Sequence, residues 1–500
     1  MSRSKIMLLS MLLLSGLLGL GIWIALPTRG EVFETATAGE LGVPEFIGTV
    51  AEPKPLPPMT IPQNPFMTDH QFGRIHHDTY NSAVVDTIAP LGHELDVSSR
   101  VMGTSAGLCI TMTVAKNGIV YANCISLPAM RLVALHPHTL EILALHNLPA
   151  RPFPPVKGDT SGGVYYYLNE DDNPVILNAD NHLQIFEYQG DLTGGDWEIL
   201  EDYDLNPYLP EDVLTQSSVI PDWDGRIWFI AQQGIVGYID RATEEVQILT
   251  LPEGEVIQND LAADPEGVYF ASDQALYQVS ADSNGIPQID WREVYERGVL
   301  KPSKVSLGSG TTPTLLGDDL IAIGDNDSPQ MNALVYHRSA DFEGDRLICK
   351  VPVFGADEST TEGTFVGYDR SLVLVNTYGY EVPRGDLRDV ASGMVRIDIR
   401  EDLSGCDIVW ESDIVTVAPP RLVTSNGLLY VYTIDMDMPR DVQAWYLTTV
   451  DFATGETVFS NYLGSGEMWN NVMVNYQMSP DGTVYMGTLN GIIAFKETAQ

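Results

Sequence analysis

Two acidic pairs in this 500-residue chain have the residue types and spacing of ligands for a hard cation. Asp325 and Asp327 stand in the segment GDNDSPQMN, and Asp435 and Asp437 stand in TIDMDMPRD. Calcium takes six to eight oxygen ligands, so these four carboxylates and Glu362 are the candidate metal ligands. The alternative is that Asp and Asn in such loops form turns by bonding to their own backbone.

A second chemically active segment is RIHHDTYNS, which spans residues 74–82. His76, His77 and Asp78 are the candidate catalytic residues, because an imidazole beside a carboxylate can transfer protons or bind a transition metal. Neighbouring side chains on an extended segment point in opposite directions, so the two histidines are not expected to share one metal. The alternative is that this segment packs across the mouth of the fold without chemistry of its own.

Several familiar catalytic signatures are missing from the chain. It contains no H-E-x-x-H metalloprotease motif, no phosphate-binding glycine loop and no C-x-x-C-H haem site. The sequence therefore names candidate residues but does not name a reaction.

The elements that must position these residues are short strands that recur along the chain. The phrase DGTVYMGTLNGIIAFK, residues 481–496, predicts a hairpin in which each strand follows a turn containing Gly. Similar units start near residues 117, 162, 224, 266, 318, 369, 426 and 481, roughly one blade length apart. Repetition at this spacing predicts an all-β, eight-bladed β-propeller. Seven blades and a β-sandwich are the alternatives, and the regular order of the hairpins disfavours the sandwich.

The last unit ends at Gln500 and leaves no room for a fourth strand. An open blade would expose a strand edge, which invites aggregation. We expect a strand from the N-terminal side, EFIGTV at residues 45–50, to pair into the last blade.

Two phrases resemble the repeat of the quinoprotein-like β-propeller superfamily. They are DGTVYMGTLNGIIAFK and VDFATGETVF, and the latter matches the D-x-x-T-G-E element of that repeat with Asp451, Thr454, Gly455 and Glu456. The resemblance covers roughly residues 105–497 and implies the propeller fold. Members of the superfamily include pyrroloquinoline-quinone dehydrogenases and non-catalytic outer-membrane assembly scaffolds.

The resemblance does not carry over a cofactor site. The dehydrogenases typically have adjacent cysteines near the quinone, and no two cysteines here are neighbours, so pyrroloquinoline quinone is less expected than calcium. The scaffolds are commonly lipid-anchored through a cysteine after the signal, and the N-terminal region here has none.

The N-terminus has the pattern of a membrane anchor. Arg3 and Lys5 precede an apolar run at residues 6–26, which is long enough to span a bilayer and favours an uncleaved signal anchor over a signal peptide. The basic residues place the propeller outside the cytoplasm, in the periplasm, or secreted if the segment is cleaved. We divide the chain into an anchor (1–30), a Pro-rich tether (31–65), an extension packing on the propeller (66–104) and the propeller (105–500).

The four cysteines suit an exported protein. Cys109 and Cys124 flank a turn at nearly equal distances, which puts them opposite one another on neighbouring strands. The sequence allows two interpretations of this pair, a disulfide and two buried thiols. Cys349 and Cys406 fall on the outer strands of successive blades, and the sequence does not say whether they meet.

The chain is strongly acidic. It has 27 Lys and Arg against 68 Asp and Glu, for a formal net charge of −41. Nucleic acid is excluded as a partner because a phosphate backbone needs a basic face. Solubility is the plainer explanation of the charge, and attraction of a cation or a basic partner is the alternative.

Two functions follow from these observations. The first is a membrane-tethered extracytoplasmic propeller that acts as a ligand- or protein-binding scaffold. The alternative is an enzyme with its site at the propeller mouth, either a quinone-dependent dehydrogenase or a calcium-dependent lactonase-like hydrolase.

Overall fold

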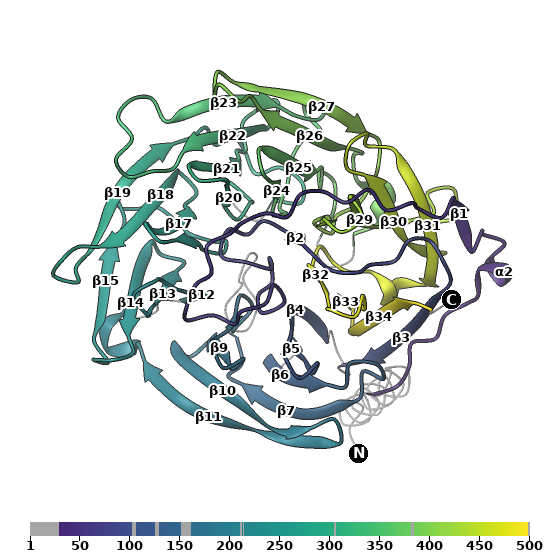
Figure 1. The fold of residues 1–500 in the computed structure, drawn as a ribbon, viewed down its shortest axis with the longest axis horizontal. Helices are drawn as coiled ribbons and strands as arrows, with labels where there is room; N and C mark the ends of the chain where they lie inside the picture. The colour runs from purple at the N-terminus through teal and green to yellow at the C-terminus, as the bar shows by residue number, and fades with distance from the viewer. Residues whose placement is uncertain are drawn as a thin grey trace, which may run out of the picture.

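Eight β-sheets stand around a central axis in the computed structural model (Figure 1). The structure describes residues 30–102, 107–125, 130–151, 162–210, 213, 215–304, 307–381 and 385–498. Each of the first six sheets consists of four strands that follow one another in the chain, and the last two sheets also take strands from the N-terminal part. The prediction of an all-β, eight-bladed propeller is confirmed.

The first four blades run from residue 108 to residue 294. Their strands are β4 (Leu108–Val114), β5 (Val120–Ile125), β6 (Met130–Leu135), β7 (Ile142–Leu148), β8 (Tyr167–Leu168), β9 (Pro174–Leu177), β10 (His182–Asp191), β11 (Gly194–Asp204), β12 (Thr215–Pro221), β13 (Arg226–Ala231), β14 (Ile235–Asp240), β15 (Val246–Thr250), β16 (Ala262–Asp264), β17 (Gly267–Ala271), β18 (Ala275–Ala281) and β19 (Pro287–Val294).

The other four blades run from residue 314 to residue 497. Their strands are β20 (Thr314–Leu316), β21 (Leu320–Gly324), β22 (Asn332–His337), β23 (Leu347–Pro352), β24 (Val366–Tyr368), β25 (Ser371–Val375), β26 (Met394–Ile399), β27 (Cys406–Ser412), β28 (Arg421–Val423), β29 (Leu428–Ile434), β30 (Ala444–Asp451), β31 (Thr457–Ser465), β32 (Tyr476–Met478), β33 (Val484–Thr488) and β34 (Gly491–Glu497).

The described part before the first blade supplies three strands and one short helix. The helix is α2 (Ala38–Leu41), and the strands are β1 (Phe46–Gly48), β2 (Val84–Val85) and β3 (Leu95–Val101). Single turns of 3₁₀ helix lie in three later connections, at Asn206–Tyr208, Leu387–Asp389 and Glu467–Trp469.

The strands of one blade differ in burial according to their distance from the axis. Strands β21 and β25 are buried at every position, whereas the outer strands β23 and β27 are largely exposed or half-buried. An inner strand packs against the neighbouring blade on both faces, so its sequence is a continuous apolar run such as LIAIG. The core therefore lies between the blades.

The last blade is closed from the N-terminal side, but not by the predicted strand. Strand β3 pairs antiparallel with β34 along its whole length, from Leu95 with Glu497 to Val101 with Gly491. Strand β1, within the predicted closing segment 45–50, instead pairs with β31 and extends the seventh blade outward. The prediction for residues 45–50 is wrong, because the sequence marks an open edge without saying which of two upstream strands covers it.

Both pairs of cysteines form disulfides. Cys109 and Cys124 lie opposite one another on β4 and β5 and are joined within the first blade. Cys349 of β23 and Cys406 of β27 are joined across the outer strands of blades five and six. The second bridge ties two neighbouring blades together at their rim.

The predicted anchor helix, residues 6–26, lies outside the described residues. Among the residues that are described, no helix has the length and apolar character needed to cross a bilayer.

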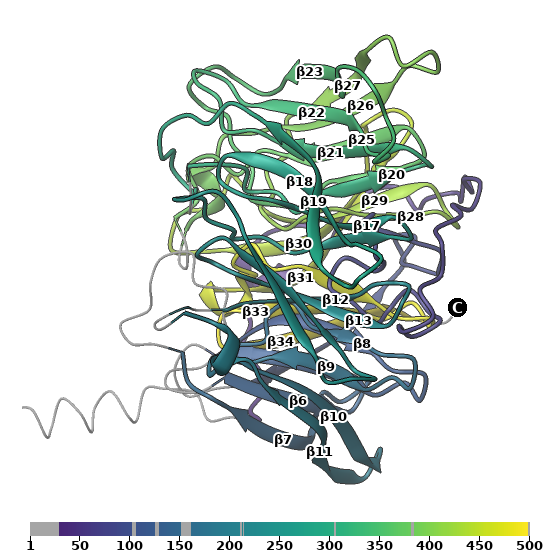
Figure 2. The ribbon, with the colours of Figure 1, turned by 90° about the vertical axis from the view of Figure 1, so that its left-hand side faces the viewer.

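Residues 64–87, which we call the axial segment, cross the centre of the ring (Figure 1). In the side view the N-terminal part gathers at one end of the propeller (Figure 2). The segment forms a hydrogen bond with the innermost strand of each blade, or with the residue that follows that strand. The acceptor is a backbone carbonyl in every case. In blade order, the bonds run from Val114 N–H to Phe72, Thr68 N–H to Leu168, Asn64 Nδ2 to Pro221, Ala263 N–H to Thr79, Leu315 N–H to Tyr80, Gly367 N–H to Ser82, Leu422 N–H to Ala83 and Thr87 Oγ1 to Ser479. The segment therefore reaches all eight blades.

Gly487 of the hairpin phrase lies where two blades approach one another closely. A Cβ at Gly487 would stand 1.6 Å from the carbonyl oxygen of Cys109, on the first strand of the next blade. Only a residue without a side chain lets blades eight and one approach this closely.

Replacing Gly487 with Ala is expected to lower the free energy of unfolding by about 2–3 kcal/mol, because the β33 and β4 backbones must move apart. Gly39→Ala is the control, since its Cβ would meet nothing within 4 Å. Chemical denaturation measures both variants. Equal stability of Gly487→Ala and the wild type would contradict the close approach of the two blades.

Candidate functional site

Six polar side chains gather around the axis, and we call them the axial cluster. Two belong to the axial segment and four to the connections that enter inner strands of blades two, four, five and six; they are Arg74, His76, Tyr165, Asp260, Lys304 and Glu362. Loops at this position on a rigid scaffold commonly carry function. The cluster lies at the end of the inner strands opposite to their first hairpin turns.

Arg74 and Asp260 form a fully buried ion pair at the centre of the cluster. Arg74 Nη2 donates to Asp260 Oδ1 at 2.8 Å and to the Leu261 carbonyl at 2.7 Å, and both charged side chains are 0% exposed. Ser218 Oγ donates to the same carboxylate oxygen at 2.6 Å. The other oxygen, Asp260 Oδ2, is buried and accepts no hydrogen bond from any described residue.

Burial raises the pKa of Asp260, while the charge of Arg74 opposes that shift. A buried acceptor without a hydrogen bond costs free energy. A hydrogen-bond donor that reached Asp260 Oδ2 would remove that cost.

His76 faces the free oxygen of Asp260. Its Nε2 lies 3.9 Å from Asp260 Oδ2 and 3.1 Å from Thr364 Oγ1. Burial lowers the pKa of His76 well below its usual value, and the positive charges of Arg421 and Arg74 lower it further. The imidazole is therefore neutral, and its contact with Asp260 is not an ion pair.

Lys304 and Glu362 form the second ion pair of the cluster. Lys304 Nζ lies 3.0 Å from Glu362 Oε1, with the lysine side chain 0% exposed. Gly310 leaves room for this pair, because a Cβ there would stand 2.5 Å from both charged atoms. Lys304 and Gly310 both belong to the connection that precedes β20, so the ion pair is part of the packing of that connection.

Tyr165 is the accessible member of the cluster. Its side chain is half-buried, and no hydrogen bond joins its hydroxyl to another described residue. Enclosure raises the pKa of Tyr165, and the negative charges of Asp260 and Glu362 raise it further. The Tyr165 ring lies 6.4 Å from the ring of His76, measured between centroids. A molecule that entered the cluster would meet a neutral phenol that can both donate and accept.

The other two candidate catalytic residues lie apart from the free oxygen of Asp260. His77 Nδ1 lies 3.1 Å from the Gln71 carbonyl, and burial lowers the pKa of this histidine. The two histidines share no hydrogen-bond partner. Asp78 accepts from Tyr80 N–H at 3.0 Å, from Ser82 N–H at 3.1 Å and from the Ser82 hydroxyl. Asp78 therefore shapes the turn of the axial segment.

The candidate metal ligands form turns and ion pairs. Asp325 accepts from Asn332 at 2.6 and 2.7 Å, and Asp327 pairs with Lys350 at 2.8 Å. Asp435 accepts from the N–H of Asp437 at 3.0 Å. Within the described ranges, no three His, Cys, Asp or Glu side chains converge as a metal site requires. Calcium binding stays a prediction, and the turn alternative accounts for these contacts.

Three members of the cluster were not singled out from the sequence. Asp260 and Lys304 stand in connections without a recognisable motif, and Tyr165 belongs to a run of three tyrosines. The usable signal was positional, since Tyr165 and Asp260 lie two residues before an innermost strand. Lys304 lies ten residues before β20, and no signal in the sequence marks it.

The comparisons with known proteins agree with this architecture. No family model matches the chain. An uncharacterised protein from Archaeoglobus fulgidus is 23% identical over 304 residues, which is 54% of this chain and 58% of that protein. The match thus spans less than two thirds of that relative.

Among solved structures, a europium-containing methanol dehydrogenase superposes with a TM-score of 0.54 at 11% identity, covering 85% of this chain and 98% of its own. This chain shares the propeller fold of that enzyme. A quinohemoprotein alcohol dehydrogenase from Comamonas testosteroni is also similar, with a TM-score of 0.49 at 10% identity, covering 86% of this chain and 81% of its own. The resemblance noted from the repeat phrases is confirmed for the fold.

The axial residues do not fit the quinone cofactor of such dehydrogenases. Pyrroloquinoline quinone carries several carboxylates that need cationic partners. Arg74 and Lys304 are each already paired with a carboxylate, and Arg421 donates to backbone carbonyls and to Asn475. The cysteines form disulfides within the first blade and at the rim of blades five and six, and none of them is adjacent to another in the sequence. We therefore derive no step through a quinone.

Asp78 predicts a pH dependence. Burial raises its pKa from 3.8 to about 6, so the folded state holds a proton that the unfolded state has lost. The contribution of Asp78 to stability is present below about pH 4 and is lost as pH rises through about 6.

Asp78→Asn removes this titration. The free energy of unfolding of the wild type minus that of the variant should fall by up to about 3 kcal/mol between pH 4 and 6.5. Urea denaturation across this range measures the difference, and Asp180→Asn, which removes an exposed carboxylate in another blade, serves as the control. A difference that is constant with pH would contradict the buried, protonated Asp78.

Proposed function

We propose that this protein is an extracytoplasmic binding protein that holds a small polar ligand at the axial cluster. The observation that carries the proposal is the buried Asp260 Oδ2, which accepts no hydrogen bond from a described residue and lies 3.9 Å from His76 Nε2, whose ring is 6.4 Å from that of Tyr165. The free carboxylate oxygen calls for a donor. The ligand we propose therefore donates hydrogen bonds, as a hydroxylated or ammonium compound does.

The place of action is part of the same proposal. The apolar run after Arg3 and Lys5 suits a membrane tether, and two disulfides suit an oxidising compartment. On this account the N-terminal segment holds the propeller at the outer face of a membrane, where it meets its ligand directly.

An enzyme is the second candidate, favoured by one contact. Neutral His76 lies 3.9 Å from Asp260 Oδ2, and its ring is 6.4 Å from that of the half-buried Tyr165. This arrangement would let the imidazole accept a proton from a bound hydroxyl group while Asp260 stabilises the resulting imidazolium. Turnover of a ligand that binds would distinguish the enzyme from the binding protein.

The test is a thermal-shift screen of residues 30–500 with two sets of compounds. The first set contains glucose, glycerol, choline and ethanolamine, and the second contains malate and citrate. We expect a member of the first set to raise Tm. Tyr165→Phe should then weaken that ligand by about tenfold, the equivalent of about one hydrogen bond.

Tyr166→Phe is the matched control. Its hydroxyl is buried and bonds to Thr113 Oγ1 and the Tyr121 carbonyl, so this variant should lose stability and keep the ligand affinity. Stabilisation by the carboxylates alone, or equal affinity of Tyr165→Phe and the wild type, would refute the proposed ligand class.

A further inference from the structure

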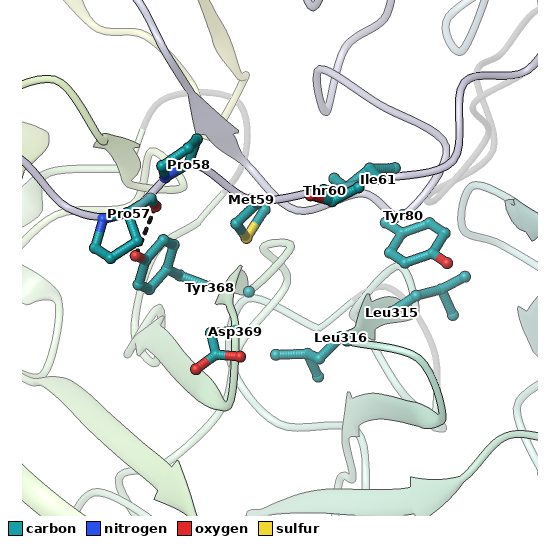
Figure 3. Close-up of a pocket in the computed structure, with 12 residues that line it drawn as sticks. Pro57, Pro58, Met59, Thr60, Ile61, Tyr80, Leu315, Leu316, Tyr368 and Asp369 are labelled. Atoms are coloured by element: carbon teal, nitrogen blue, oxygen red, sulfur yellow. Dashed lines mark hydrogen bonds between the residues drawn. The ribbon is translucent and has the colours of Figure 1, made fainter.

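A groove of about 340 Å³ lies at the other end of the inner strands, beneath the Pro-rich segment (Figure 3). Its roof is residues 57–61, which we call the proline strap. Its floor is the first hairpin turn of blade five, at Leu315 and Leu316, and that of blade six, at Tyr368 and Asp369. The volume is in the range of small-molecule sites.

The strap is anchored on both sides of the groove. Upstream, Lys54 N–H donates to Asn426, Leu56 N–H donates to Thr424, and the Tyr368 hydroxyl donates to the Pro57 carbonyl at 2.8 Å. Downstream, Asn64 donates to Pro221 at 2.8 Å. Prolines at 57 and 58 have no N–H to offer a strand edge, so the strap spans the two blades as a bridge. The space below the strap therefore forms because the chain crosses above the two blades between its two anchored ends.

The lining is mainly apolar, with Thr60 and the tyrosines Tyr80 and Tyr368 as its neutral polar side chains and Asp369 as its charged one. In Figure 3, Met59 and Leu316 point into the groove from roof and floor, and Tyr80 and Tyr368 flank it. Gly317 and Gly367 add no side chain to the floor. Such a lining receives an aliphatic or aromatic body of modest size.

The charged group of the lining is the carboxylate of Asp369. Its residue is exposed at the edge of the groove, and no hydrogen bond or ion pair joins its side chain to another described residue. The nearby cations are committed elsewhere, since Arg396 pairs with Asp398 at 2.8 Å and Arg370 donates to the carbonyls of Arg400 and Glu401. The negative charge at the mouth of the groove is therefore uncompensated.

We propose that the groove binds a small organic cation whose apolar body lies under the proline strap and whose ammonium group meets Asp369. Apolar walls with one carboxylate at the rim complement that distribution of charge and reject an anion of the same shape. The proposal is independent of the axial ligand, because the groove and the axial cluster lie at opposite ends of strands β20 and β24.

The experiment is isothermal titration of residues 30–500 with 2-phenylethylammonium, 2-phenylethanol and 3-phenylpropanoate. We expect the ammonium compound to bind at least tenfold more tightly than the alcohol, and the carboxylate not to bind. Asp369→Asn should remove this preference. Asp369 has a φ of 52°, a left-handed conformation that Asn adopts readily, so the variant keeps the turn.

Two controls decide the location of the bound cation. Asp180→Asn removes one exposed charge in another blade and should leave binding unchanged, which separates Asp369 from the general acidity of the chain. Tyr165→Phe should also leave binding unchanged. Loss of binding in Tyr165→Phe but not in Asp369→Asn would place the cation at the axial cluster and overturn the proposal, as would equal binding of all three compounds.

Discussion

The hydrogen bonds between the axial segment and the innermost strands are the constraint on which the rest of the structure depends. A ring of eight blades leaves the inner edge of each sheet facing the axis, with backbone groups that must be paired. The N–H groups of Ala263, Leu315 and Gly367 find their acceptors within four residues of the axial segment, at Thr79, Tyr80 and Ser82. One stretch of chain thus completes the blades, fills one end of the axis and carries Arg74 and His76 inward.

The distribution of charge follows from the same arrangement. A chain with a net charge of −41 has few cations, yet Arg74, Lys304 and Arg421 are all fully buried near the axis. Each is compensated there, by a carboxylate or by carbonyl groups. The acidic surplus remains on the surface, where it is solvated, while the interior is nearly balanced. Asp260 Oδ2 is left without a hydrogen-bond partner among the described residues, as are Arg74 Nε and Glu362 Oε1, and Asp260 Oδ2 is the acceptor that indicates a donating ligand.

The fold was predictable because each hairpin repeats the same local chemistry. Turns such as Asp481–Gly482 and the alternating strands after them identify blades without reference to the rest of the chain. Closure was harder, since the choice between residues 45–50 and β3 depends on how the chain runs across the propeller. The candidate site was predictable only in part: His76 and Glu362 were named, whereas Asp260 and Lys304 acquire meaning from partners far away in sequence.

The central claim is that the axial segment bonds to every blade and so creates the axial cluster. Hydrogen exchange at the N–H groups of Ala263, Leu315, Gly367 and Leu422 tests it most directly. Each of these four N–H groups donates its hydrogen bond to the axial segment, and not to the neighbouring strand of its own blade. We predict that they exchange only through global unfolding, as slowly as the buried strands β21 and β25. Rapid exchange at these positions, with β21 and β25 still protected, would contradict the account.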